Sequence, residues 1–144
     1  GRGFWRPPML VQSIEALGDV PLGAARELGL SAAQLRAVRR GLSKAVDGGT
    51  GRHLHESQPA LAPFIAGKTG TAEVGGSSRD HSWFAGYMPR EAPRLAFAVL
   101  IEDSGLHGNE AALPVFERLL AKPAVRDLLA ADVLPARALA EEGR

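Results

Sequence analysis

The segment RLAFAVLIE, at residues 94–102, restricts more than any other feature how this chain can fold. Alternate residues of an extended strand point to opposite faces of a sheet, and here both sets are apolar: Leu95, Phe97, Val99 and Ile101 on one face, and Ala96, Ala98 and Leu100 on the other. Because apolar side chains on both faces need cover on both faces, we expect this strand to lie in a sheet with protein on either side.

Two further extended segments precede this strand. Their patterns place strands at roughly 64–74 and at 82–88, where the sequence reads SWFAGYM. The connections, GGSSRD and PREAP, are short and rich in turn-forming residues. Strands joined in this way pair with their neighbours in sequence, so residues 64–102 predict a three-stranded antiparallel meander.

Helices are expected on both sides of the meander in sequence. Residues 31–47 open with the capping box SAAQ and then repeat apolar residues at helical spacing before two glycines: Leu35, Val38, Leu42 and Val46. A second helix follows Asn109, near 112–121, and residues 123–144 resemble a short helix and a frayed tail. Residues 1–30 fit either a short strand or an irregular crossing segment. The fold class is therefore α/β of the α+β kind, an antiparallel sheet with helices packed on its faces.

Composition and charge argue against several kinds of protein. The 144 residues carry 17 Lys and Arg against 16 Asp and Glu, and the basic residues form no stripe with aromatic residues, so we expect no nucleic-acid partner. The chain has no cysteine, which excludes disulfides and thiolate metal sites. His53 and His55 do not by themselves supply the three or four ligands of a zinc site, and we expect no metal and no cofactor. No apolar run reaches the ~20 residues of a membrane-spanning helix.

The first strand of the meander contains the residues best suited to bind a ligand. Lys68 offers an ammonium group, Thr69 and Thr71 offer hydroxyls, and Gly70 has no side chain to obstruct a ligand backbone. A strand edge can pair with an extended peptide through main-chain hydrogen bonds, while charged and hydroxyl groups hold a terminal carboxylate. The same backbone N–H groups could polarise a carbonyl under attack. A plain strand that enters a turn remains the alternative interpretation.

Four segments in order carry a resemblance to a known family. AGKTGTAE, HSWFAGYMP, RLAFAVLIED and AALPVFERLL resemble the end of the transpeptidase domain of penicillin-binding proteins, in which Lys-Thr-Gly is one of three recurring elements. The resemblance extends over residues 1–121, with 122–144 as a C-terminal helical tail, and is greatest to the monofunctional (class B) enzymes. A bifunctional class A enzyme remains an alternative.

The resemblance implies an activity and roles for individual residues. In that family a serine attacks the penultimate D-Ala carbonyl of a peptidoglycan stem peptide, D-Ala leaves, and an acceptor amine takes the acyl group. By resemblance, Lys68 and Thr69 bind the carboxylate of the substrate or of a β-lactam, and Lys68 tunes the field around the nucleophile. Gly70 permits close approach, and Thr71 contributes a hydroxyl and a backbone N–H to the oxyanion hole. Lys68 and Thr71 are thus the expected catalytic residues.

The family's partners and location are likewise expectations. The expected ligands are peptidoglycan stem peptides and β-lactams. We also expect contact with a membrane through an anchor outside these residues, and a membrane glycosyltransferase as a further partner. The expected location is the periplasmic side of the bacterial cytoplasmic membrane, and the expected roles are cell shape or cell division.

Two elements of the family pattern are missing. None of the serines has Lys three residues later, and the family's Ser-x-Asn is absent, since the nearest match, SRD at 78–80, follows Lys-Thr-Gly instead of preceding it. We therefore interpret the chain as the C-terminal part of a longer enzyme that is inactive alone. A sensor of β-lactams or peptides, and a β-lactamase or D,D-carboxypeptidase of the same fold, remain alternatives. We also expect the isolated chain to aggregate, because strand 94–102 would be an uncovered sheet edge.

Overall fold

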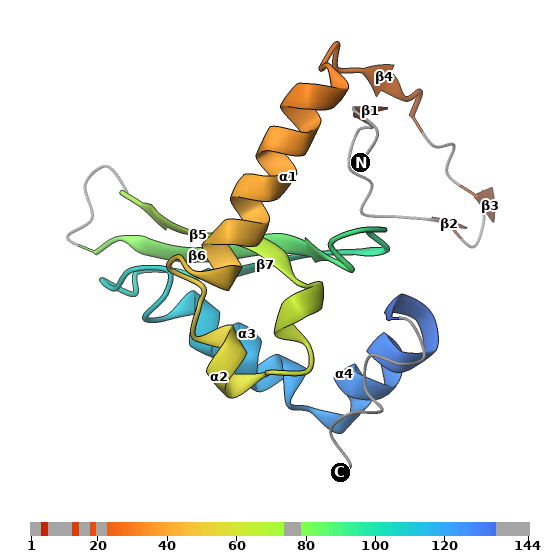
Figure 1. Cartoon of the computed structure of the whole chain (residues 1–144). Coiled ribbons are helices and arrows are strands. Elements are labelled where there is room, and N and C mark those ends of the chain that lie inside the picture. Colours follow the sequence, from red (N-terminus) through yellow and green to blue (C-terminus); the bar gives the residue numbers. More distant parts are fainter. Residues whose placement is uncertain (1–3, 6–12, 15–17, 20–22, 74–78, 135–144) are drawn as a thin grey trace. The chain divides into compact units, whose positions relative to one another are not determined.

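The structure, a computed structural model, describes residues 4–5, 13–14, 18–19, 23–73 and 79–134. The chain divides into two compact units, Gly1–Val38 and Arg39–Arg144 (Figure 1). In the first unit the described part of the undecided segment forms two antiparallel pairs of very short strands: β1 (Phe4–Trp5) with β4 (Arg26–Glu27), and β2 (Ser13–Ile14) with β3 (Gly18–Asp19).

Helix α1 (Ala32–Asp47) begins in the first unit and continues into the second. The predicted capping box is formed, because Gln34 N donates to Ser31 Oγ at 3.2 Å and Ser31 N donates to Gln34 Oε1 at 2.8 Å. The helix ends where Gly48 N and Gly49 N both donate to the carbonyl of Lys44, at 3.1 Å. Of the predicted apolar stripe, Val46 is fully buried in the core of the second unit.

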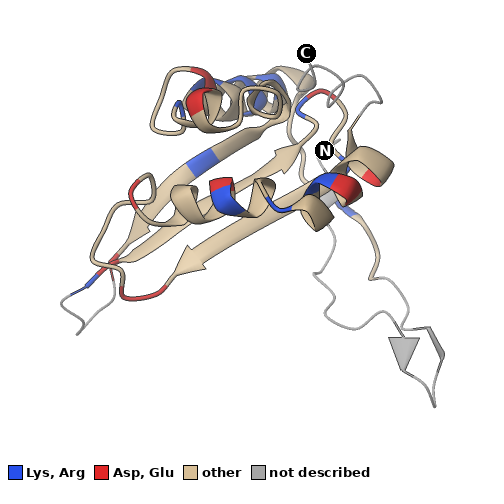
Figure 2. Ribbon diagram, turned by 90° about the horizontal axis from the view of Figure 1, so that it is seen from below, with Lys and Arg blue, Asp and Glu red and all other residues tan. Residues whose placement is uncertain are grey.

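The predicted meander forms the centre of the second unit. Strands β5 (Ala66–Ala72), β6 (His81–Met88) and β7 (Leu95–Ile101) pair antiparallel in the order β5-β6-β7, so that β5 and β7 are the edges of this sheet. Strand β5 starts two residues later than predicted, since Ala62–Phe64 forms a 3₁₀ turn, η1, with Pro63 inside it. The sheet is nearly free of charge: Lys68 is the only Lys, Arg, Asp or Glu in the three strands (Figure 2).

One face of the sheet is covered by helix α3 (Ala112–Leu120), which lies under β6 and β7 in Figure 1. Three rings join the two layers, with Phe84–Phe116 centroids 5.1 Å apart and Phe97–Phe116 centroids 4.2 Å apart. The short helix α2 (Leu54–Ser57) adds Leu54, which is fully buried in the same core. Burial of the three phenylalanine rings contributes to the stability of the unit, because each aromatic side chain removes a large apolar area from water.

The opposite face of β7 differs from the prediction. Leu95, Phe97, Val99 and Ile101 pack toward the core, whereas Ala96, Ala98 and Leu100 are exposed in the part of the chain that the structure describes. The expectation that both faces are covered is therefore met on one face only. Alanine at two of the three open positions keeps the exposed apolar area small.

The described chain ends in two short helical segments, α4 (Pro123–Leu128) and the π-helical turn η2 (Leu129–Val133). These confirm the short helix predicted after Pro123, while the predicted tail beyond Leu134 lies outside the described residues. Across the ranges that the structure describes, no helix is long and apolar enough to cross a lipid bilayer.

Candidate functional site

The four residues singled out from the sequence lie consecutively on β5, at the outer edge of the sheet. The Thr69 side chain is buried, Gly70 is half-buried, and Lys68 and Thr71 are exposed. An edge strand has no neighbour on its outer side, so its backbone N–H and C=O groups there are free to pair with an extended ligand. The position therefore suits the peptide-binding role predicted for this stretch.

A pocket of about 420 Å³ opens along this edge. Its lining joins the strand to two loops that are distant in the sequence, and consists of Thr50, Lys68, Thr69, Gly70, Thr71, His107, Gly108 and Asn109. The volume falls in the range of ordinary small-molecule sites. All four predicted residues are thus brought together, and four residues that sequence reasoning did not identify join them.

At one end of the pocket, the Lys68 ammonium is bonded to two oxygens of Thr69, and the Thr69 hydroxyl in turn contacts Thr50. Thr69 Oγ1 lies 2.6 Å from Thr50 Oγ1, and Lys68 Nζ donates to Thr69 Oγ1 at 3.3 Å and to the Thr69 carbonyl oxygen. No ion pair joins Lys68 to a carboxylate among the residues described. The ammonium is therefore bonded to neutral oxygens only, which leaves its charge available for an anion from solution.

Thr50 reaches this end because of the glycines beside it. A Cβ on Gly49 would lie 2.9 Å from the Cα and carbonyl oxygen of Ala45, so only glycine allows the chain to fold back against the last turn of α1. Gly51 N then donates to Ala45 O at 2.8 Å, which closes the turn. The GGTG sequence at residues 48–51 was not singled out as part of a site, although glycine on both sides of a single threonine was the signal that could have identified Thr50.

The loop between β7 and α3 forms the other wall. His107 Nδ1 lies 3.2 Å from Thr71 Oγ1. Beside it, Gly108 is buried against the sheet, where a Cβ would lie 2.4 Å from the carbonyl oxygen of Trp83 and 2.7 Å from that of Gly70. The missing side chain of Gly108 is what lets this loop approach β5 closely enough for His107 to reach Thr71.

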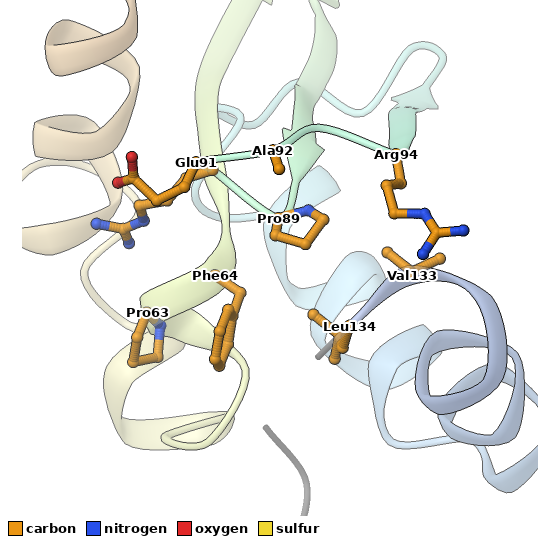
Figure 3. Close-up of a pocket in the computed structure, with 9 residues that line it drawn as sticks. Pro63, Phe64, Pro89, Glu91, Ala92, Arg94, Val133 and Leu134 are labelled. Carbon is orange, nitrogen blue, oxygen red and sulfur yellow. The ribbon is translucent and has the colours of Figure 1, made fainter. Parts of the chain in front are cut away.

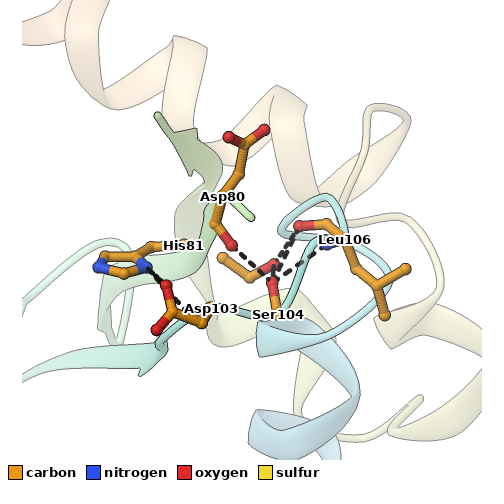
Figure 4. A network of polar contacts seen from close by, with 6 residues as sticks. Asp80, His81, Asp103, Ser104 and Leu106 are labelled. Carbon is orange, nitrogen blue, oxygen red and sulfur yellow. Dashed lines mark hydrogen bonds and ion pairs between the residues drawn. The ribbon is translucent and has the colours of Figure 1, made fainter. Parts of the chain in front are cut away.

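A polar network around the buried Ser82 holds this loop in place (Figure 4). Ser82, which is fully buried on β6, donates from Oγ to the carbonyl oxygen of Leu106 and lies 2.9 Å from Ser104 Oγ. Ser104 Oγ also lies 3.2 Å from the carbonyl oxygen of Asp80 and accepts from Leu106 N at 3.2 Å. Asp103 N donates to His81 Nδ1 at 3.0 Å, which anchors the start of the loop. The loop that carries His107 is therefore fixed by side chains of β6 and its own backbone.

A second pocket, of about 400 Å³, lies away from Lys68 (Figure 3). Its wall is mostly apolar and comprises Pro63, Phe64, Pro89, Arg90, Glu91, Ala92, Arg94, Val133 and Leu134. The Arg90 guanidinium is already engaged, because it donates to both carboxylate oxygens of Asp47, at 2.9 and 3.0 Å, and to the carbonyl oxygen of Ala62. This pocket offers no hydroxyl and no set of groups that points to acyl transfer.

Two side chains outside the Lys68 pocket have perturbed pKa values. The hydrogen bond from Arg90 lowers the pKa of Asp47 below its usual value, against a smaller opposing effect of burial. Burial raises the pKa of Tyr87. Neither residue lines the Lys68 pocket. Within the described ranges, no three His, Asp or Glu side chains lie together as metal ligands would.

Known proteins resemble this chain in sequence. The sequence model of the family described as "Penicillin binding protein transpeptidase domain" matches residues 2–121. The peptidoglycan D,D-transpeptidase PbpA of Mycolicibacterium smegmatis is 48% identical over 44 residues, which are 28% of this chain and 9% of the relative. The peptidoglycan D,D-transpeptidase MrdA of Acinetobacter baumannii is 34% identical over 97 residues, which are 56% of this chain and 14% of the relative.

A solved structure agrees with these relatives. The D,D-transpeptidase domain of a peptidoglycan glycosyltransferase from Eggerthella lenta superposes with a TM-score of 0.54 and 29% identity, over 85% of this chain and 30% of that one. Together with the strand-edge pocket, these matches define a domain of the penicillin-recognising class. The chain belongs to the penicillin-binding protein transpeptidase domain family, as its resemblance predicted. It spans only 9% and 14% of the lengths of the two curated relatives.

Proposed function

We propose that this chain forms the carboxylate-binding part of a peptidoglycan D,D-transpeptidase, which cross-links stem peptides by acyl transfer from their D-Ala-D-Ala end and is acylated by penicillins. The observation that carries the proposal is the Lys68 ammonium, which has only neutral oxygen partners among the described residues and lies in a pocket on an edge strand. A terminal carboxylate is an anion of the right size and charge for that position.

The four site residues of β5, Lys68 to Thr71, have separate roles in this proposal. The carboxylate of the ligand takes the place beside Lys68 Nζ and Thr69 Oγ1, which are 3.3 Å apart and already share a hydrogen bond. Gly70 lets the ligand backbone lie against the strand, and the backbone N–H of Thr71 stabilises the oxyanion that forms at the attacked carbonyl. Positioning a substrate in this way lowers the barrier before any bond is formed.

The attacking group is placed outside these 144 residues. None of the serines has the lysine that activates the family's nucleophile, so we propose that a Ser-x-x-Lys element elsewhere in the protein forms the acyl-enzyme. Residues 1–121 then belong to the transpeptidase domain and 122–144 to a C-terminal tail. We place the enzyme on the periplasmic side of the cytoplasmic membrane, with an anchor outside these residues and a membrane glycosyltransferase as partner, in cell-wall growth or division.

Labelling with a fluorescent penicillin tests this function. We expect no covalent label on residues 1–144 alone, and a label on a polypeptide that extends upstream through a Ser-x-x-Lys element. In the longer polypeptide, Lys68→Ala should slow acylation by about 100-fold or more, as does loss of a group that holds transition-state charge. Labelling of residues 1–144 alone, or an unchanged rate in the variant, would contradict the proposal.

Transfer of the acyl group to an acceptor amine separates the proposed activity from its alternatives. A β-lactam sensor would be labelled but would transfer nothing, a D,D-carboxypeptidase would pass the acyl group to water, and a β-lactamase would release hydrolysed penicillin quickly.

A further inference from the structure

His107 occupies the wall of the pocket that faces Thr71, and its position is set by the loop around it. Its backbone N donates to Glu110 Oε2 at 2.9 Å, and its carbonyl oxygen accepts from Glu110 N at 2.9 Å and from Ala111 N at 3.1 Å. The ring is exposed toward the pocket, with Nδ1 at 3.2 Å from Thr71 Oγ1. A histidine held this firmly presents one ring nitrogen to one hydroxyl.

We propose that His107 is a positioning residue of the pocket beside Lys68: its Nδ1–H donates to Thr71 Oγ1, and so directs the Thr71 hydroxyl proton toward an acceptor oxygen of the bound ligand. This inference rests on the proposed function. A threonine hydroxyl has one proton to donate and two lone pairs to accept with, whereas the carbonyl and carboxylate oxygens of the ligand only accept. If Thr71 donated to His107, it would have no proton left for the ligand.

The surroundings of the loop support a positioning role. Gly108, buried against the strand backbone, and Ser82, bonded to the carbonyl oxygen of Leu106, fix the loop on either side of His107. The backbone position from which the His107 ring reaches Thr71 is therefore set before any ligand arrives, which lowers the ordering cost on binding. Lys68 supplies the charge at one end of the pocket, and His107 acts through Thr71 at the other.

Two substitutions separate the hydrogen bond from the shape of the ring. His107→Phe keeps a ring and removes both nitrogens, whereas His107→Asn places an amide N–H where Nδ1 stood. The longer polypeptide is used, and the first-order acylation rate and the apparent Kd for a fluorescent penicillin are measured separately, together with the melting temperature. His53→Phe is the matched control, because His53 is an exposed histidine on a different loop.

We expect His107→Phe to lower the second-order acylation constant by about 3- to 10-fold, as loss of one hydrogen bond does. His107→Asn should recover most of that loss. The melting temperatures of both His107 variants should stay unchanged, and so should the acylation constant of the His53→Phe control. In a Thr71→Val background, His107→Phe should have no further effect, because the hydroxyl that it positions is gone.

Four results would overturn the inference. An unchanged acylation constant in His107→Phe, or equal losses in the Phe and Asn variants accompanied by a lower melting temperature, would leave His107 with a structural role or none. Full additivity with Thr71→Val would show that the two residues act independently. If the unsubstituted polypeptide is not acylated at all, the proposed function fails and this inference with it, whereas normal labelling with an unaffected His107→Phe removes this inference alone.

Discussion

Substitution of Gly108 by alanine tests how the pocket wall is held against the sheet. The new Cβ would lie 2.4 Å from the carbonyl oxygen of Trp83, and 2.7 and 2.8 Å from the carbonyl oxygen and the nitrogen of Gly70. All three atoms belong to strand backbone, so no flexible side chain can move aside. Either the loop lifts away from β5 or the strands shift. Overpacking of this kind costs about 1–3 kcal/mol.

The consequence for the site follows from the same geometry. When the loop lifts, His107 separates from Thr71 and the backbone of Gly70 loses its cover, so acylation should fall together with stability. Urea denaturation of the longer polypeptide should show a free energy of unfolding lower by about 2 kcal/mol, and penicillin labelling should slow at least as much as in His107→Phe.

Gly41→Ala is the matched control for Gly108→Ala. Gly41 lies inside α1, and apart from the backbone of its own helix and its chain neighbours no described atom lies within 4 Å of an added Cβ, so alanine there should raise stability by about 1 kcal/mol through its better helix propensity. A Gly108→Ala protein as stable as the parent, with an unchanged acylation rate, would refute the argument that backbone contact fixes this wall.

Three further predictions concern stability and association. Because the pKa of Asp47 is lowered in the folded state, its ion pair with Arg90 stabilises the fold fully above the ordinary pKa of 3.8, and this contribution is lost as pH falls through the lower folded pKa. Asp47→Asn should remove that part of the acid dependence of the free energy of unfolding, measured by urea titration at several pH values. A pH profile identical to that of the parent would contradict this. Phe116→Ala should lower the free energy of unfolding by about 3–5 kcal/mol, whereas Leu119→Ala, at a side chain that is 44% exposed, should change it little, as denaturation curves would show. Residues 1–144 alone should associate in sedimentation experiments, through the edge of β7, and a monodisperse monomer with cooperative unfolding would contradict this.

Local patterns were enough to predict the three-stranded meander and helices α1 and α3, but not the short strands β1–β4, helix α2 or the turn η1. Strand β7 and the Ser31–Gln34 capping box each depend on residues a few positions apart, and both are formed, although only one face of β7 is covered. The start of β5 was placed too early, because the turn at Ala62–Phe64 satisfies its backbone by a local 3₁₀ pattern that apolar residues do not reveal. Strand pairing followed from the short connections alone.

The pocket walls could not be predicted in the same way. Thr50 meets Thr69 across 19 positions, and His107 meets Thr71 across 36. Both contacts depend on how closely two loops approach β5, which is decided by the glycines at 49 and 108 and by the buried Ser82. Contacts between residues so far apart in the sequence arise from tertiary packing, and no periodicity in the sequence indicates which residues will meet.

The isolation of Lys68 on an otherwise uncharged sheet has a consequence beyond ligand binding. A second copy of β5 that paired antiparallel along this open edge would bring two ammonium groups close together in a partly dehydrated contact, where like charges repel strongly. A peptide that ends in a carboxylate meets attraction at the same place. The single charge of Lys68 thus makes the β5 edge attract peptides that end in a carboxylate and disfavours pairing with the β5 edge of another copy of the chain. A neutral residue at this position would lose both properties.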